Sequence, residues 1–264
     1  MRPVHALSAT LLALLSTAAL LLGAGPASAA TGPYVALGDS YSSGEGAGDY
    51  TGDSGSCHRS PHAYPQLWAT ANSPSSFVFA ACSGATTQDV INGQLGSLNS
   101  STRLVSISIG GNDAGFADAM QTCVLQGTDA CVGAVNKAKS FATGQLPGRL
   151  DQVYTQIHNR APNARVVVLG YPHLYKIGGS CSFGISDTSR SAINGAADTI
   201  DSVVSGRASA HGFAFGDVRG AFTNHEICSA DWWLNSTRIP VHESYHPNAK
   251  GQAQGYLPTL SAKD

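Results

Sequence analysis

The sequence carries little charge and no excess of either sign. Charged residues make up 12% of the 264 residues, and the formal net charge at pH 7 is −2. Such a chain has no electrostatic footprint for binding nucleic acid or an anionic membrane surface. After residue 30 it also lacks internal repeats and any apolar run approaching about 18 residues. We therefore expect no nucleic-acid partner and no stable membrane anchor.

Aspartate, glutamate and lysine are absent from the first thirty residues. This segment carries the positive charge of Arg2 near its start and then an apolar run over 6–22. Small residues occupy 27–30, after Pro26. A positive start, a hydrophobic middle and a small-residue exit are typical of a secretory signal peptide. We expect cleavage after Ala29 or Ala30. Residues 31–264 are then a single domain, which we expect to be secreted, extracellular and monomeric.

No two of the six cysteines are spaced as a close C-x-x-C pair, which argues against a cysteine metal site. In an oxidising destination six cysteines predict three disulfides instead. Many connectivities remain open. Pairing neighbours along the chain gives short loops and no crossing threads, and we expect this pattern: Cys57–Cys82, Cys123–Cys131 and Cys181–Cys228.

Five short apolar runs are typical of buried strands, at 34–38, 77–81, 104–110, 165–170 and 213–218. Helical spacing lies between them, most clearly in the stripe Leu146, Leu150, Val153, Tyr154 and Ile157, again over 193–208, and from near 248 to 256. Strands that alternate with helices predict an α/β fold, a flavodoxin-like three-layer α/β/α sandwich with a five-stranded parallel sheet. Long irregular stretches remain at 44–61, 171–187 and 220–246, and loops of that length tend to be functional.

Chemically capable residues follow the predicted strands, where ligands bind in such sheets. Ser40 follows the first run, Gly84 the second and Asn112 the third, and His246 lies in a loop before the last helix. Each has a plain structural interpretation when taken alone: a helix cap, two turns and a packing histidine. Together they supply a nucleophile, oxyanion donors and a base, which is the set that acyl transfer requires.

The chain resembles the SGNH (GDSL) hydrolase family. Its four blocks match GDSYSSGEG at 38–46, CSGATT at 82–87, GGND at 110–113 and ESYHPN at 243–248. The resemblance implies a serine ester hydrolase that cleaves acyl glycerols and related lipids, with no cofactor and no metal. A phospholipase or deacetylase of the same fold is the alternative.

The resemblance also implies a role for each matching residue. Ser40 is the expected nucleophile, and His246 is the general base. The N–H groups of Ser40 and Gly84 and the side-chain amide of Asn112 form the expected oxyanion hole.

One position departs from the family's pattern. Asp usually stands three residues before the histidine, and Glu243 stands there in this chain. Three alternatives follow for the third role in the triad: the Glu243 carboxylate orients His246, a main-chain carbonyl near Glu243 or Ser244 does so, or the role is weak.

Two other motifs suggest proteases. Residues 52–55 read GDSG, as in chymotrypsin-like enzymes, but they lie early in the chain with no histidine before them in the mature sequence. His242 and His246 fit the H-E-x-x-H zinc metalloprotease motif, which must be helical. Pro240 and Pro247 oppose a helix there. His58 and His62, which straddle Pro61, face the same objection.

A non-catalytic carbohydrate-binding domain is a third class of function. Trp68, Trp232 and Trp233 have the side chains that stack on sugars. Aromatic residues make up only 8% of the chain, so we expect these three in the core and in pocket walls instead.

Overall fold

A parallel sheet forms the centre of the molecule. The computed structural model describes residues 32–181 and 184–264, so the predicted signal peptide lies outside the described residues. The strands are β1 (Tyr34–Gly38), β2 (Phe77–Phe79), β3 (Leu104–Ser108), β4 (Arg165–Leu169) and β5 (Ala214–Gly216). Their order is β2-β1-β3-β4-β5, with every neighbouring pair parallel. This is the flavodoxin-like order, and it confirms the expected fold.

The two central strands are buried along their whole length. Every residue of β1 and of β3 is buried, as expected for strands covered by helices on both faces. Their register pairs Tyr34 with Leu104 and Gly38 with Ser108, so both strands end at the same edge. Several strands are shorter than predicted. The second ends at Phe79 because the N–H groups of Ala80 and Ala81 both donate to the carbonyl of Ala36.

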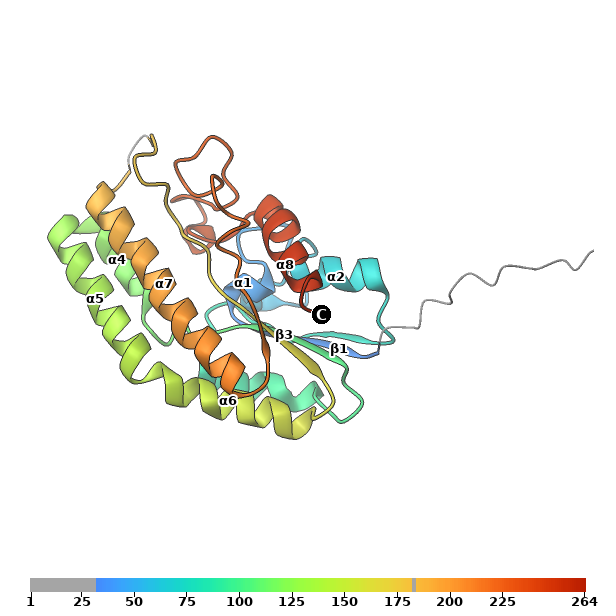
Figure 1. The fold of residues 1–264 in the computed structure, drawn as a ribbon. Coiled ribbons are helices and arrows are strands. Elements are labelled where there is room, and N and C mark those ends of the chain that lie inside the picture. Colours follow the sequence, from blue (N-terminus) through green and yellow to red (C-terminus); the bar gives the residue numbers. More distant parts are fainter. Residues whose placement is uncertain (1–31, 182–183) are drawn as a thin grey trace, which may run out of the picture.

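Helices cover both faces of this sheet (Figure 1). The α-helices are α1 (Ser40–Ser43), α2 (Tyr64–Asn72), α3 (Thr87–Asp89), α4 (Phe116–Leu125), α5 (Thr128–Gly144), α6 (Leu146–Arg160), α7 (Asp187–Ala210) and α8 (Leu257–Ser261). Short 3-10 helices are η1 (Gly55–Cys57), η3 (Leu95–Ser97) and η4 (Val241–Glu243), and π-helical segments are η2 (Val90–Gln94) and η5 (Gly251–Tyr256). Helices α5, α6 and α7 lie on one side of the sheet, and α2 and α8 lie on the other.

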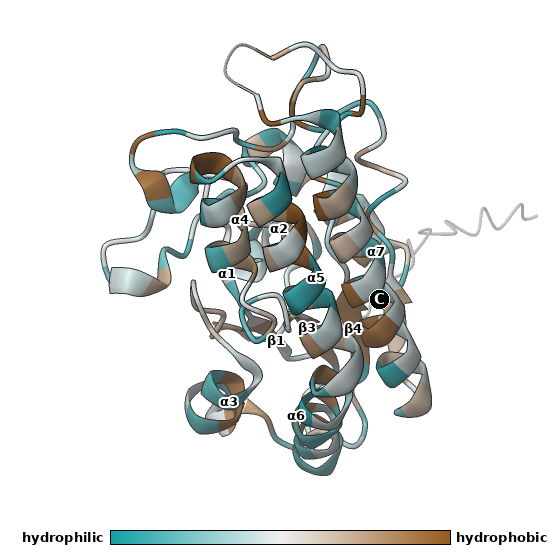
Figure 2. Cartoon of the chain, turned by 90° about the vertical axis from the view of Figure 1, so that its left-hand side faces the viewer, coloured by the Kyte–Doolittle hydropathy of each residue, from teal (hydrophilic) through white to brown (hydrophobic). Residues whose placement is uncertain are grey.

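The predicted stripe of α6 is its buried face. Its five apolar residues are fully buried, and the helix ends at Arg160, two residues before Pro162. Hydrophilic residues colour much of the rest of α6 in Figure 2. The last helical region differs from the prediction, since it continues through η5 into α8 and ends at Ser261. Helices α4 and α5 were not predicted.

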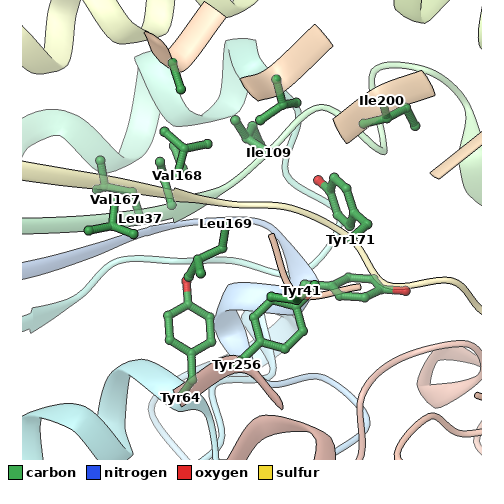
Figure 3. Close-up of a cluster of buried hydrophobic side chains, with 14 of the residues drawn as sticks. Leu37, Tyr41, Tyr64, Ile109, Val167, Val168, Leu169, Tyr171, Ile200 and Tyr256 are labelled. Atoms are coloured by element: carbon green, nitrogen blue, oxygen red, sulfur yellow. The ribbon is translucent and has the colours of Figure 1, made fainter. Parts of the chain in front are cut away.

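A cluster of tyrosines packs against one face of the sheet beside α1 (Figure 3). The rings of Tyr64 and Tyr256 are stacked with their centroids 5.4 Å apart, and the ring of Tyr41 lies 6.2 Å from that of Tyr256. All three residues are buried. Because Tyr41 belongs to α1, this packing holds that short helix against α2 and η5.

Three disulfides tie the loops to the core. They join the cysteines that were expected to pair: Cys57–Cys82, Cys123–Cys131 and Cys181–Cys228. The first connects two segments that lie near the end of β1. Every helix in the described part of the chain is too short or too polar to cross a membrane.

Candidate active site

The turn after β1 places Ser40 at the edge of the sheet. Gly38 has a φ of +124°, and a Cβ there would lie 2.5 Å from the carbonyl oxygen of Ser108, so only glycine fits. Asp39 caps α1 by accepting from the N–H of Tyr41, and Ser40 is the first helical residue. The sequence suggested that a serine would be this cap, whereas the aspartate before it takes that role. Ser40 is thereby left free to face the edge.

Ser40 and His246 are in hydrogen-bond contact. The Oγ atom of Ser40 lies 2.8 Å from Nε2 of His246, although 206 positions separate them in the chain. Burial of the imidazole lowers the pKa of His246 to about 4. The ring is therefore neutral at pH 7 and able to accept the hydroxyl proton across this contact.

Asn235 fastens the loop that carries His246. Its side-chain amide donates to the carbonyls of Gly46 and Glu243, and its backbone N–H donates to the carbonyl of His246 at 2.9 Å. A Cβ at Gly46 would lie 2.7 Å from that of His246, so the loop after α1 also packs closely here. The sequence alone did not identify Asn235, since its partners are distant backbone carbonyls that no motif reveals.

The carboxylate of Glu243 is engaged away from His246. Tyr50 donates its hydroxyl proton to Oε1 at 2.9 Å, and Arg238 Nε lies 3.1 Å from Oε2. Within the described chain, the buried Nδ1 of His246 has no hydrogen-bond partner of regular geometry. The backbone carbonyls of Ser244 and His242 are close enough to favour the protonated ring, and so they oppose the effect of burial on its pKa.

Two further loops bring backbone and side-chain donors to the same edge. Gly84 has a φ of +77° with open space around its α-carbon, and no hydrogen bond among the described residues uses its N–H. Asn112 donates from Nδ2 to the carbonyl of Ala85 at 3.0 Å, which holds its amide beside that turn. The Asp113 carboxylate accepts from the N–H and hydroxyl of Thr87 and so ties both loops together. A cavity of about 620 Å³ adjoins Gly84.

Asp39 is a buried carboxylate beneath the site. It accepts hydrogen bonds from Tyr171 at 2.5 Å and from the hydroxyl of Ser108 at 2.7 Å. Burial raises the pKa of Asp39 to about 6, although these donors lower it. The hydroxyl of Tyr171 in turn accepts from the N–H of Gly111 at 3.2 Å. This network joins the first and third loops of the site, and motif spacing alone did not show it.

The two histidines of the H-E-x-x-H pattern do not share a ligand site. The segment holds only the 3-10 turn η4, and Ser244 is extended, so no helix aligns the side chains. His246 contacts Ser40, whereas Nδ1 of His242 contacts the carboxylate of Glu45. The geometry that a zinc protease of this type needs is absent from these residues.

The chain is similar over most of its length to a known family and to solved structures. Residues 36–254 match the GDSL-like Lipase/Acylhydrolase family. The chain is 56% identical over 261 residues to a lipase of Streptomyces rimosus, and the aligned region covers 97% of this chain and 97% of that lipase. Two crystal structures superpose with a TM-score of 0.87, and each covers 89% of this chain and 100% of its own. One is phospholipase A1 from Streptomyces albidoflavus, at 60% identity, and the other is an extracellular lipase from S. rimosus, at 57%.

Proposed function

Because this chain belongs to the GDSL-like lipase/acylhydrolase family, we propose that it hydrolyses acyl glycerols and related lipid esters through an acyl-enzyme on Ser40. Members of the family are carboxylic ester hydrolases. One observation carries the assignment of the residues. The Oγ atom of Ser40 lies 2.8 Å from Nε2 of His246, a partly buried histidine that is neutral at pH 7.

In the acylation step, Ser40 Oγ attacks the ester carbonyl carbon while His246 Nε2 takes the hydroxyl proton. The carbonyl oxygen becomes an oxyanion, which accepts hydrogen bonds from the N–H groups of Ser40 and Gly84 and from Nδ2 of Asn112. The intermediate then expels the alcohol, which receives the proton from His246. Water then attacks the carbonyl carbon of the acyl-enzyme while His246 takes its proton. The second intermediate releases the carboxylic acid as Ser40 Oγ regains the proton from His246.

We assign the orientation of His246 to backbone carbonyls and not to Glu243. The support is the placement of the carboxylate on Tyr50 and Arg238, while the carbonyls of Ser244 and His242 lie by the ring. Glu243 then acts as a residue that positions the loop. The catalytic pair is a serine–histidine dyad.

A fluorophosphonate probe followed by mass spectrometry tests the nucleophile. We expect a single adduct, on Ser40, and turnover of p-nitrophenyl esters that EDTA does not abolish. Ser40→Ala should lose both labelling and turnover. Ser54→Ala, which alters the serine of the GDSG segment, is the matched control and should keep both. An adduct elsewhere, or activity retained by Ser40→Ala, would overturn the assignment.

Phospholipids are a second candidate substrate class. The observation that favours them is the 60% identity to a phospholipase A1. We propose assays of the wild-type chain on triacylglycerol emulsions and on phosphatidylcholine vesicles at equal ester concentration. Release of the sn-1 acyl chain at the higher kcat/KM would assign a phospholipase A1. Faster release from the emulsion would assign a lipase.

We also propose that residues 1–30 are a cleaved export signal and that residues 31–264 form a single, monomeric domain. The relative from S. rimosus is an extracellular lipase. Sequencing the N-terminus of protein from the culture medium should find Ala30 or Thr31 first. Size-exclusion chromatography with light scattering should find the mass of one chain.

A further inference from the structure

Glu45, His58 and His242 form a cluster beside the catalytic pair. Their donor atoms lie within 4.8 Å of one another. The Oε1 atom of Glu45 is 2.9 Å from Nδ1 of His58 and also contacts Nδ1 of His242. Three different segments therefore bring two imidazole nitrogens to one carboxylate oxygen. Since the residues are far apart in sequence, no spacing motif could show this arrangement.

The charges in this cluster are unequally buried. The Glu45 side chain is 2% exposed, whereas those of His58 and His242 are 26% and 42% exposed. Both imidazoles contact the carboxylate, and a buried carboxylate is costly without a compensating charge. The two rings are stacked, with centroids 4.3 Å apart and planes at 18°. A cation between the three donor atoms would supply that compensating charge.

The donor set has the composition of a zinc site. Two imidazoles and one carboxylate suit Zn²⁺ and similar borderline divalent ions. Donor atoms around a tetrahedral zinc are about 3.3 Å apart, for bonds of about 2.0–2.1 Å. The Glu45–His58 separation of 2.9 Å needs to open by about 0.4 Å to reach this spacing, and the shorter Glu45–His242 contact needs to open further. Each ring must carry its remaining proton on Nε2 when its Nδ1 binds the metal.

The neighbours of the cluster hold it in place. The second oxygen of Glu45 accepts from the hydroxyl of Ser83, and such outer contacts orient metal ligands. His58 and Ser83 each follow a cysteine of the Cys57–Cys82 disulfide. Glu45 follows Gly44, which caps α1. The ligands are thus preorganised by a covalent link and by the helix that carries Ser40.

We propose that Glu45, His58 and His242 bind one Zn²⁺-like divalent cation, which fastens the loop of His246 to the segment after α1. His246 is not a ligand, so this site is distinct from the H-E-x-x-H pattern. The cation takes no part in bond cleavage, because the three donors are not the atoms of the Ser40–His246 contact. It stabilises the folded chain by binding that state preferentially.

Isothermal titration calorimetry with ZnCl₂ on the EDTA-treated and dialysed chain tests the proposal. We expect one ion per chain and a melting temperature that rises with Zn²⁺ concentration. Glu45→Gln and His242→Asn should each weaken binding by at least about tenfold. The second change alters a partly exposed side chain, so it remains informative if the first variant does not fold, which circular dichroism would reveal.

Two control variants separate this site from other histidines. His62→Ala removes a nearby imidazole that pairs with the exposed Asp49 at 2.9 Å, and it should bind Zn²⁺ as the wild type does. His246→Ala should also bind normally while it loses activity. Absence of binding in the wild type would overturn the proposal. So would binding that survives Glu45→Gln and His242→Asn, or that falls equally in either control. Because binding is measured without substrate, these outcomes are independent of the esterase assignment.

Discussion

Asn235 donates its backbone N–H to the carbonyl oxygen of His246 at 2.9 Å. The same residue accepts from the N–H of Tyr245 at 2.9 Å and sends its side-chain amide to Gly46 and Glu243. One buried asparagine therefore connects both sides of the histidine loop to the segment after α1. We infer that it affects the proposed reaction by positioning His246, without itself contacting the ester.

Replacing Asn235 should impair the position of His246. In Asn235→Ala the carbonyls of Gly46 and Glu243 lose their donor, which costs about 1–3 kcal/mol of unfolding free energy. We expect kcat on p-nitrophenyl esters to fall by roughly tenfold or more, with a smaller change in KM. Asn163→Ala, at an exposed asparagine that donates to Ser100, is the control and should leave kcat unchanged. Equal kcat in both variants would contradict a positioning role.

The Glu243 carboxylate should be dispensable for the chemical step. Glu243→Gln keeps the size of the side chain and its contact with Tyr50, and we expect kcat to stay within about threefold of the wild type. His246→Ala removes the base and should lower kcat by about a thousandfold or more. If Glu243→Gln loses activity on the scale of His246→Ala, the carboxylate orients the ring and the dyad assignment is wrong.

Removing the Asn112 amide should selectively weaken the transition state. We expect Asn112→Ala to lower kcat by about 10²–10³, equivalent to about 2.7–4 kcal/mol, with little change in KM. Asn136→Ala changes an exposed residue of α5 and serves as the reference for mutational effects on stability. A variant at Asn112 with unaltered kcat and normal folding would remove this residue from the oxyanion hole.

Asp201 should make the fold less stable as the pH rises. Its side chain is buried, and burial raises the pKa of Asp201 from 3.8 to about 7, although the N–H of Tyr171 and Arg219 lower it. The folded chain therefore binds a proton that the unfolded chain has already released. The resulting stability is complete below pH 3.8 and is lost as the pH rises through about 7.

Urea unfolding at pH 5 and pH 8 measures this effect. We expect the wild type to lose roughly 2–4 kcal/mol more over this interval than Asp201→Asn, which has no proton to release. Asp198→Asn is the control, because that aspartate is half exposed and its pKa is lowered by His173 and Arg219. A pH dependence that is unchanged in Asp201→Asn would assign the titration to another group.

The spacing of apolar residues was sufficient to predict those elements whose buried side carries large apolar residues. The stripe from Leu146 to Ile157 predicts α6 because a helix half-covered by the core needs apolar residues every three or four positions. Helix α5 escaped prediction because its buried side consists of small residues such as Ala138 and Ala142, which give a weak apolar period. The end of the last helix was misplaced because η5 passes directly into α8, with Pro258 near the start of α8, where proline is tolerated.

The candidate site also contains some residues that local motifs predict and others that depend on contacts between distant segments. Ser40, Gly84, Asn112 and His246 could be predicted as site residues because each belongs to a short block that follows a strand or precedes the last helix. No local motif predicts a role for Asn235 or Glu45, since their roles depend on contacts between segments that only folding brings together. The orientation of the Glu243 carboxylate was left open for this reason too, because Tyr50 and Arg238 had no visible connection to it in the sequence.

The distance along the chain between Ser40 and His246 also determines when activity can begin. The proposed nucleophile is made first, and its proposed proton acceptor lies 206 positions later. A nascent or truncated chain that stops before His246 therefore carries a serine hydroxyl with no base beside it. Under the proposed mechanism, ester cleavage therefore requires a chain that has been made at least as far as His246 and has folded.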